Sequence, residues 1–378
     1  MSDPIIIIGS GFAAYQLIKN IRRQDEQVPI EVFTGDDGAE YNKPDLSHVF
    51  TKQQGADALV QQSGAAFAEQ YNVTLHANTW VDNINIQDKC VYSNGQAHRY
   101  SKLVFATGAS AFIPPVAGNG ARHIVTLNSL DEYRRAQHDI NHADTVLIIG
   151  GGLIGIELAM DLQSSGKKVL VVEPNSRILS NVAPDFVALK LEQQLISNGV
   201  ELILNNIVDS VSTNTDKTLC VTTKTGLQYQ VDCIISAAGL RPNTHLAQQA
   251  GVAVNRGINV DSQLRTSATD VYALGDCAEI NGKVMAYLQP IVLSANTLAK
   301  TLLGQDAQLN FPAMMVKVKT PSYPIQVGGV FNADSTWKVD FSSQGIRAEA
   351  FDEQHNLTGF VVTDSNVQHA FSLLRKVA

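Results

Sequence analysis

Two segments of this 378-residue chain repeat one local pattern, and this repetition restricts the fold more than any other feature. The segments, PIIIIGSGFAAYQL from Pro4 and TVLIIGGGLIGIELA from Thr145, each contain an apolar run, a glycine-rich turn and a helix-forming stretch. A short strand, a turn of closely spaced glycines and a helix are the context of a dinucleotide-binding G-x-G-x-x-G/A motif. We therefore predict an α/β fold with two Rossmann-like dinucleotide-binding domains.

The first unit has a predicted strand at 5–8 and a predicted helix at 12–22. Between them Gly9 permits a tight turn, and Gly11 leaves room for a pyrophosphate against the backbone. Ala14 takes the third small position, where helix and strand pack closely. The amide groups at the start of the helix then face the phosphates.

The second unit keeps glycine at all three positions of the motif: Gly150, Gly152 and Gly155. We expect a strand at 145–149 before them and a helix at 156–165 after them. Glycine also serves ordinary turns and helix ends, so one such motif alone would be weak. Two complete units favour one binding site for each of two dinucleotides.

Acidic residues follow the next strand of each unit and are candidates for binding a ribose. After the predicted strand at 30–33, we prefer Asp37, with Asp36 close behind; a solvated acidic turn is the alternative for either residue. In the second unit Glu173 favours NADH, because its carboxylate repels the extra phosphate of NADPH. Arg177 opposes this preference, since a nearby guanidinium could accommodate that phosphate.

Three further stretches fit the same architecture. KLVFATG at 102–108 and CIISAAG at 233–239 each read as a buried strand that ends in a small-residue turn. TDVYALGDCA places Asp276 after a short strand and before a helical pattern at 290–303, where its carboxylate could bind a polyhydroxyl chain. From about Leu309 the chain alternates polar and apolar residues and closes with a helical pattern at 367–376, which predicts a small C-terminal α+β domain.

Composition excludes several classes of protein. A formal charge of −8 argues against nucleic acid as a partner, and no apolar run reaches the roughly 20 residues that cross a bilayer. No basic leader precedes the first predicted strand, so we expect a soluble, cytoplasmic protein. The four cysteines are Cys90, Cys220, Cys233 and Cys277, and five histidines stay unassigned: His48, His76, His98, His123 and His138. Neither group shows the spacing of metal ligands, so we predict no metal site.

The motifs GSGFAA, YNKPDLS, ATG, GGGLIGIE, AAGLRPNT and YALGDCAEI occur in this order along the chain. Together they resemble the FAD- and NAD(P)H-dependent pyridine nucleotide oxidoreductase family. The resemblance implies a discontinuous FAD-binding domain at 1–110 and 240–308, an NADH-binding domain at 111–239 and a C-terminal interface domain at 309–378. Within the family the chain is most similar to rubredoxin reductases, especially NADH:flavorubredoxin reductases, which support nitric oxide reduction.

The resemblance also implies which residues bind the cofactors, a tightly but non-covalently held FAD and NADH as electron donor. The implied FAD contacts are Gly9, Gly11, Ala14, Asp36, Asp37, Lys43, Pro44, Val81, Ala106, Thr107, Gly108, Gly275, Asp276, Gln289, Pro290, Ile291 and Lys319. The implied NADH contacts are Gly150, Gly152, Leu153, Ile154, Gly155, Glu157, Glu173, Arg177 and Gly239.

The YNKPDLS segment constrains the mechanism. Disulfide-forming members of the family have paired cysteines beside the flavin, whereas this chain has Lys43 to Ser47, KPDLS, in the corresponding segment. We therefore predict a flavin that passes electrons from NADH to the acceptor without a thiol relay, and no catalytic acid, base or nucleophile. Lys43 and Lys319 are candidates for tuning the flavin, and we expect a structural role for Cys277.

Several functions share these motifs. The leading expectation is an NADH-dependent reductase of a flavorubredoxin or another rubredoxin-type iron protein, acting as a monomer. Alternatives are a rubredoxin or ferredoxin reductase of a hydroxylase or oxygenase system, an NADH-responsive flavoprotein that acts as an interaction partner, and an NADH oxidase. Rubredoxins are commonly acidic, so docking on this acidic chain needs a local basic patch, with five candidates: Lys300, Lys317, Lys319, Arg375 and Lys376.

Overall fold

The computed structural model describes residues 3–215, 218–318, 320, 323–332 and 334–377. The chain divides into two compact units. Unit 1 comprises Met1–Lys43, Ala56–Ser110 and Leu240–Phe311, and unit 2 comprises Pro44–Gly55, Ala111–Gly239 and Pro312–Ala378. The predicted functional domains, with boundaries at 110, 239 and 308, stay predictions.

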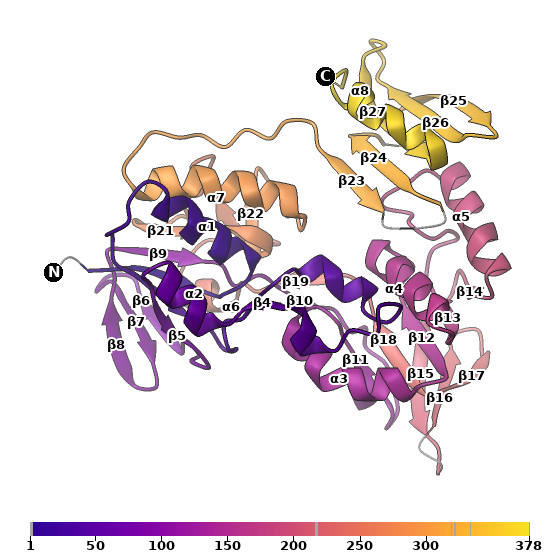
Figure 1. Ribbon diagram of the computed structural model, residues 1–378, viewed down its shortest axis with the longest axis horizontal. Coiled ribbons are helices and arrows are strands. Elements are labelled where there is room, and N and C mark those ends of the chain that lie inside the picture. The colour runs from indigo at the N-terminus through magenta and orange to yellow at the C-terminus, as the bar shows by residue number, and fades with distance from the viewer. Residues whose placement is uncertain (1–2, 216–217, 319, 321–322, 333, 378) are drawn as a thin grey trace. The chain divides into compact units, whose positions relative to one another are not determined.

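Unit 1 is built on a parallel five-stranded sheet of order β21-β9-β1-β2-β5. Its central strand is fully apolar and buried, as expected of a parallel sheet covered on both faces. Helices α1 and α7 pack side by side in this unit (Figure 1). These elements are β1 (Ile5–Ile8), α1 (Phe12–Arg22), β2 (Ile30–Phe33), β5 (Thr74–His76), β9 (Lys102–Phe105), β21 (Val271–Ala273) and α7 (Leu288–Leu302).

Smaller elements complete unit 1. An antiparallel sheet contains β6 (Asn83–Asn85), β7 (Cys90–Ser93) and β8 (Gln96–Arg99). Three strand pairs are β3 (Glu40–Tyr41) with β4 (Val60–Gln62), β10 (Ala109–Ala111) with β19 (Leu240–Pro242), and β20 (Ile258–Val260) with β22 (Ala278–Ile280). The short helices are α2 (Gly64–Gln70) and α6 (His245–Gln249), with 3-10 turns η2 (Ala56–Leu59) and η4 (Gly275–Cys277).

Unit 2 contains a second parallel sheet, of order β11-β18-β12-β13-β14. Its elements are η1 (Lys43–His48), η3 (Ala121–His123), β11 (Ile124–Val125), α3 (Leu130–His142), β12 (Thr145–Ile149), α4 (Leu153–Ser164), β13 (Lys168–Val172), α5 (Asp185–Ser197), β14 (Glu201–Ile203) and β18 (Cys233–Ser236). An antiparallel sheet adds β15 (Val208–Thr213), β16 (Leu219–Thr223) and β17 (Gln228–Val231).

The C-terminal part of unit 2 is an antiparallel sheet of order β23-β24-β27-β26-β25. The buried face of β27 packs against the short helix α8, as Figure 1 shows in yellow. The elements are β23 (Met315–Val318), β24 (Ile325–Gly329), β25 (Thr336–Ser342), β26 (Gly345–Phe351), β27 (Leu357–Thr363), η5 (Asp364–His369) and α8 (Ala370–Leu374).

The predicted fold class is confirmed: two parallel α/β sheets and a small C-terminal α+β domain. The predicted helix at 156–165 begins earlier, at Leu153, because the open Gly152 already has the extended backbone of an N-terminal cap. In the described part of the chain, no helix is both long enough and apolar enough to cross a membrane.

Candidate functional site: two glycine cradles

The first glycine cradle follows β1 in unit 1. Gly9 has a φ of +111°, and a Cβ there would lie 2.3 Å from the carbonyl oxygen of Ala106, so only glycine fits. A Cβ on Gly11 would meet nothing within 4 Å, which leaves open space over the start of α1. No side chain caps α1 and its first turn holds no acidic residue, so its amide groups can receive an anion such as a phosphate. Ala14 is fully buried behind this turn.

The turn after β2 holds the two predicted ribose residues. The Asp36 carboxylate accepts hydrogen bonds from Ser10 Oγ at 2.8 Å and Thr34 Oγ1 at 2.6 Å, so it ties this turn to the glycine turn. The Asp37 carboxylate accepts from the backbone N–H of Ala39 at 3.0 Å. Both aspartates are exposed beside the cradle. A ribose role for either residue stays a prediction.

Trp80, in the segment after β5, lies over this turn and was missed as a candidate by the sequence analysis. Its side chain is 74% exposed, and a Cβ on Gly35 would lie 2.4 Å from its ring, so the indole covers the turn that leads to Asp36. The predicted residue Val81 instead packs against the core of unit 1. The sequence carried no signal for this residue, because the exposure of Trp80 and its contact with Gly35 arise only in the folded chain.

The ATG turn after β9 is held by a residue that the sequence analysis also missed. Asn243 donates from Nδ2 to the carbonyl of Thr107 at 2.8 Å, and its backbone N–H donates to Gly108 O at 3.0 Å. Thr107 Oγ1 returns a hydrogen bond to the Asn243 carbonyl at 2.8 Å. The predicted residues Ala106, Thr107 and Gly108 therefore form a fixed turn beside the first cradle, since Gly9 contacts Ala106.

Asp276 of unit 1 has a buried carboxylate oxygen that a bound molecule could satisfy. Its Oδ1 atom is buried and has no hydrogen-bond partner among the described residues. Burial raises the pKa of this carboxyl group, and the positive charge of Lys43 acts in the opposite direction. A buried polar atom without a partner is costly, so a hydroxyl donor from a bound molecule would stabilise it. The arrangement fits a polyhydroxyl group.

The start of α7 offers a second uncapped helix end in unit 1. Tyr287 provides no side-chain cap, and the first turn contains no acidic residue. Gln289 is exposed, whereas Pro290 and Ile291 are buried at the base of the turn. Gly275 has a φ of +85°, and a Cβ there would lie 2.8 Å from the Ala13 side chain. The turn that carries Asp276 therefore packs closely against α1.

Cys277 lies next to Asp276 but is fully buried. Its Sγ atom contacts the carbonyl oxygens of Phe105 at 3.6 Å and Leu274 at 3.4 Å. Burial raises the pKa of this thiol, so it stays protonated and is a poor nucleophile. All four cysteines, which lie within the described residues, are free.

The second cradle follows β12 in unit 2 and has the same geometry. Gly150 has a φ of +110°, and a Cβ there would lie 2.6 Å from Ala237 O. Gly152 is the N-cap of α4, with open space around the position of a Cβ, and no side chain caps the helix. A Cβ on Gly155 would lie 2.0 Å from Gly150 O, so helix and strand pack as closely as the third glycine position requires.

Glu173 and Arg177 have different surroundings in the structure. Glu173 is buried at the end of β13, and its Oε2 atom accepts the backbone N–H of Gly151 at 2.6 Å, so its carboxylate lies against the second cradle. The Arg177 guanidinium forms an ion pair with Glu192, Nη1 to Oε2 at 3.5 Å. The Arg177 guanidinium, which could have accommodated the 2′-phosphate of NADPH, is thus paired with the Glu192 carboxylate of α5.

The other predicted NADH residues lie on or near α4 in unit 2. Leu153 begins the helix and Ile154 is 48% exposed at its first turn. Glu157 is buried and accepts a hydrogen bond from Ser47 Oγ at 2.8 Å. Gly239 has a φ of +110°, and its carbonyl accepts the Phe112 N–H at 2.9 Å. Two residues predicted to contact the flavin remain. Pro44 is half-buried in η1, and Lys319 lies outside the described residues.

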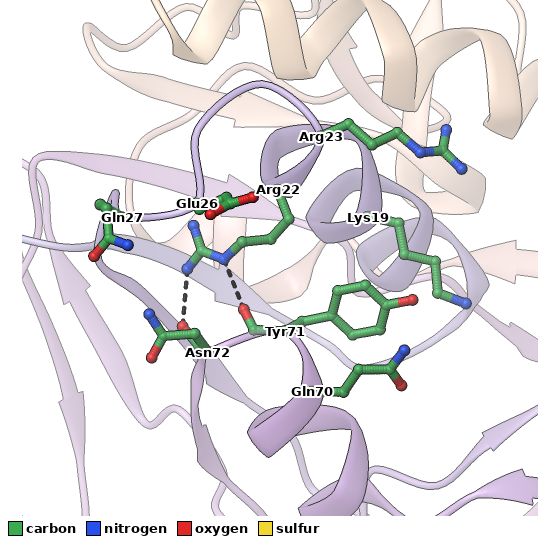
Figure 2. Close-up of a pocket in the computed structure, with 8 residues that line it drawn as sticks. All are labelled: Lys19, Arg22, Arg23, Glu26, Gln27, Gln70, Tyr71 and Asn72. Carbon is green, nitrogen blue, oxygen red and sulfur yellow. Dashed lines mark hydrogen bonds between the residues drawn. The ribbon is translucent and has the colours of Figure 1, made fainter.

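A polar pocket at the other end of α1 does not coincide with either cradle. Figure 2 shows Lys19, Arg22 and Arg23 around it, together with Tyr71 of the segment after α2. The Arg22 guanidinium donates to the carbonyls of Tyr71 at 2.6 Å and Asn72 at 2.9 Å. The Arg22 donors therefore join α1 to the backbone at Tyr71 and Asn72, and we assign no ligand to this pocket.

Two glycine cradles, each with an open glycine and an uncapped helix, define the class of oxidoreductases that bind two dinucleotides. Residues 3–295 match the family described as pyridine nucleotide-disulphide oxidoreductase, and the chain belongs to this family. It is an oxidoreductase that uses a flavin and a pyridine nucleotide. Residues 308–377 match a second family, described as rubredoxin binding C-terminal domain.

Full-length relatives agree with this assignment. The chain is 57% identical over 378 residues, all of this chain and 99% of the relative, to a protein of Vibrio vulnificus (strain CMCP6) named nitric oxide reductase FlRd-NAD(+) reductase. It is 46% identical over 376 residues, 99% of each chain, to a protein of that name from Escherichia coli O9:H4 (strain HS). The putidaredoxin reductase–putidaredoxin complex contains a chain of the same fold, with TM-score 0.90, 21% identity, and coverage of 99% of this chain and 93% of that one.

Proposed function

We propose that this protein is an FAD-dependent reductase that transfers electrons from NADH to the rubredoxin centre of a flavorubredoxin and so supports nitric oxide reduction. The observation that carries the proposal is the match of residues 308–377 to a rubredoxin-binding domain on the same chain as two dinucleotide cradles. The names of the full-length relatives support the same acceptor. Bound FAD would accept a hydride from NADH and release electrons singly to an iron centre.

We assign FAD to the first cradle and NADH to the second. Around the first cradle, Gly11 admits the pyrophosphate, the start of α1 faces it, and Asp276 accepts hydrogen bonds from the ribityl hydroxyls. Around the second, Gly152 admits the pyrophosphate. Glu173 disfavours a 2′-phosphate there, and the Arg177 guanidinium is ion-paired with Glu192. Both features support NADH over NADPH.

Matched variants of the two open glycines test this assignment. Gly11 and Gly152 have φ values of −71° and −74° and free space at the Cβ position, so valine is tolerated by the backbone in both. We expect Gly11→Val to weaken FAD binding on the order of 100-fold, about 2.8 kcal/mol. Gly152→Val should retain the flavin absorbance and raise the KM for NADH. Equal loss of flavin in both variants would contradict the assignment.

Anaerobic NADH oxidation tests the acceptor. The FAD-loaded protein is mixed with a rubredoxin domain, a plant-type ferredoxin or buffer, and flavin and acceptor absorbance are followed. Rapid reduction of the rubredoxin domain alone is the expected result. Preference for ferredoxin would instead indicate an oxygenase chain, and flavin reduction without transfer would indicate a role in signalling.

A further inference from the structure

Three metal-ligating side chains, which the sequence spacing did not connect, meet in unit 1. Glu31 Oε2 lies 3.0 Å from His76 Nε2 and 3.9 Å from His98 Nδ1, and one ligand atom from each residue lies within 4.8 Å of the others. The three side chains are 20 to 27% exposed, so an ion can reach them from solvent.

Strand pairing explains why these residues meet. In the parallel register of β2 and β5, Phe33 is opposite His76. Glu31 precedes Phe33 by two residues and therefore points to the same face of the sheet. His98 comes from β8 of the antiparallel sheet, which lies beside β5 in Figure 1, in agreement with the measured distances.

The two imidazole rings are already held in place. Phe33 stacks on the His76 ring with centroids 4.2 Å apart and an interplanar angle of 13°, and its edge meets the His98 ring at 4.8 Å. The Nε2 atom of His98 lies 3.3 Å from Ser93 Oγ. A hydrogen bond from Nε2–H to this hydroxyl leaves Nδ1 as the free lone pair toward Glu31, as outer partners of metal-binding histidines commonly do.

We propose that Glu31, His76 and His98 bind one zinc ion, with water at a fourth position. Two imidazole nitrogens and one carboxylate oxygen suit Zn²⁺, whereas Mg²⁺ and Ca²⁺ prefer oxygen ligands alone. Tetrahedral ligands at zinc bond lengths lie about 3.3 Å apart. The two spacings from Glu31, 3.0 and 3.9 Å, fall on either side of that value, and the three ligand atoms, all within 4.8 Å of one another, would draw together on the ion. The sequence-based prediction of no metal rested on spacing along the chain, which says nothing of residues joined by strand pairing.

Bound zinc would link the two sheets close to the first cradle. The backbone N–H of Thr34 donates to His76 O at 3.2 Å, and the Asn78 N–H donates to Asp36 O at 2.8 Å. Zinc on His76 would therefore hold the turn that carries Asp36. This inference does not depend on the electron acceptor.

Calorimetric titration of the chelator-treated, FAD-loaded full chain with zinc chloride tests the proposal. We expect one ion per chain with a micromolar or lower Kd, no binding of magnesium chloride, and a higher thermal unfolding midpoint with zinc. His76→Ala and His98→Ala should each weaken zinc binding at least about 10-fold, and Glu31→Gln should do the same. Flavin absorbance and circular dichroism verify that the variants are folded.

His138→Ala is the matched control, because His138 is 78% exposed and its ring lies 4.3 Å from that of His142 on α3. It should leave zinc binding unchanged. Unchanged zinc binding in His76→Ala and His98→Ala would overturn the proposal, as would loss of binding in His138→Ala or a Kd above about 100 μM in the wild type. Anomalous scattering at the zinc edge from wild-type crystals soaked in zinc chloride provides a second measurement that needs no variant: a peak between the three side chains supports the site, and its absence contradicts it.

Discussion

Asp276 has one carboxylate oxygen in a buried position without a described partner, and this affects stability and cofactor binding in opposite directions. Burial raises the pKa of the carboxyl group above its ordinary value. In the cofactor-free protein the charged carboxylate is therefore less favourable in the folded than in the unfolded state. FAD, in our proposal, reverses this because its ribityl hydroxyl groups would donate hydrogen bonds to the carboxylate.

We predict that Asp276→Asn weakens FAD binding by about 10- to 100-fold, since a hydrogen bond to a charged group contributes about 1.5–3 kcal/mol. The same variant should unfold at a higher urea concentration than the wild type when both are free of cofactor at neutral pH. This gain should shrink as the pH falls toward the raised pKa, because the folded wild type then takes up a proton and loses the burial penalty. Flavin fluorescence titration and urea unfolding measure the two effects, and a cofactor-free variant no more stable than the wild type at neutral pH would contradict the argument.

At this scale the sequence predicts a residue when its role depends on neighbours along the chain. The open and strained glycines of both cradles are of this kind, because a turn needs them wherever it lies. Asn243 could not be predicted in its role, since its partner Thr107 lies in the turn after β9, more than 130 residues earlier. The ion pair of Arg177 with Glu192 and the meeting of Glu31 with two histidines have the same cause.

At the scale of elements, α4 begins at the second glycine cradle and also fixes a neighbouring segment of the chain. Two buried carboxylates one turn apart on this helix bind the segment that contains η1. Glu157 accepts from Ser47 Oγ, and Asp161 accepts the backbone N–H groups of Phe50 at 2.7 Å and Thr51 at 3.3 Å. The segment 44–55 is thus fixed to unit 2 by hydrogen bonds to α4, although it interrupts the sequence of unit 1.

We predict that Asp161→Ala lowers the free energy of unfolding by about 3 kcal/mol, since it leaves two backbone N–H groups without an acceptor at about 1–3 kcal/mol each. Limited proteolysis should then cleave within 49–55 faster than in the wild type. Asp139→Ala, an exposed aspartate of α3, is the control and should change neither measurement. If both variants lose the same stability, the hydrogen bonds to the segment do not hold it.

Sequence patterns located most elements because strands and helices have local periodicities, but their grouping into units depends on contacts across the chain. The predicted C-terminal helix at 367–376 is shorter, at Ala370–Leu374, and follows the 3-10 turn η5. Periodicity could not separate these two kinds of helix, since both place apolar residues at three- to four-residue spacing.

For the whole molecule, charge poses the remaining question, because this protein is acidic and the rubredoxin-type acceptor that we propose is expected to be acidic too. The C-terminal part of unit 2 offers a local solution. Lys317 of β23 places its Nζ atom 5.7 Å from the ring centroid of Phe371 on α8, and that ring is 62% exposed. Arg375, also exposed, follows Phe371 by one helical turn. We call these three residues the basic–aromatic patch.

We predict that Lys317→Glu combined with Arg375→Glu lowers kcat/KM for the rubredoxin domain by about 10-fold at low salt, because surface charges act mainly on the rate of encounter. Reduction of ferricyanide, a small acceptor, should be unchanged. Wild-type activity with rubredoxin should fall as salt is raised toward 1 M, where the screening length is about 3 Å, and the variant should depend less on salt. Lys338→Glu, an exposed lysine of β25, is the matched control. If the wild type shows no salt dependence, or if Lys338→Glu is equally slow, the acceptor does not bind through charges of the basic–aromatic patch.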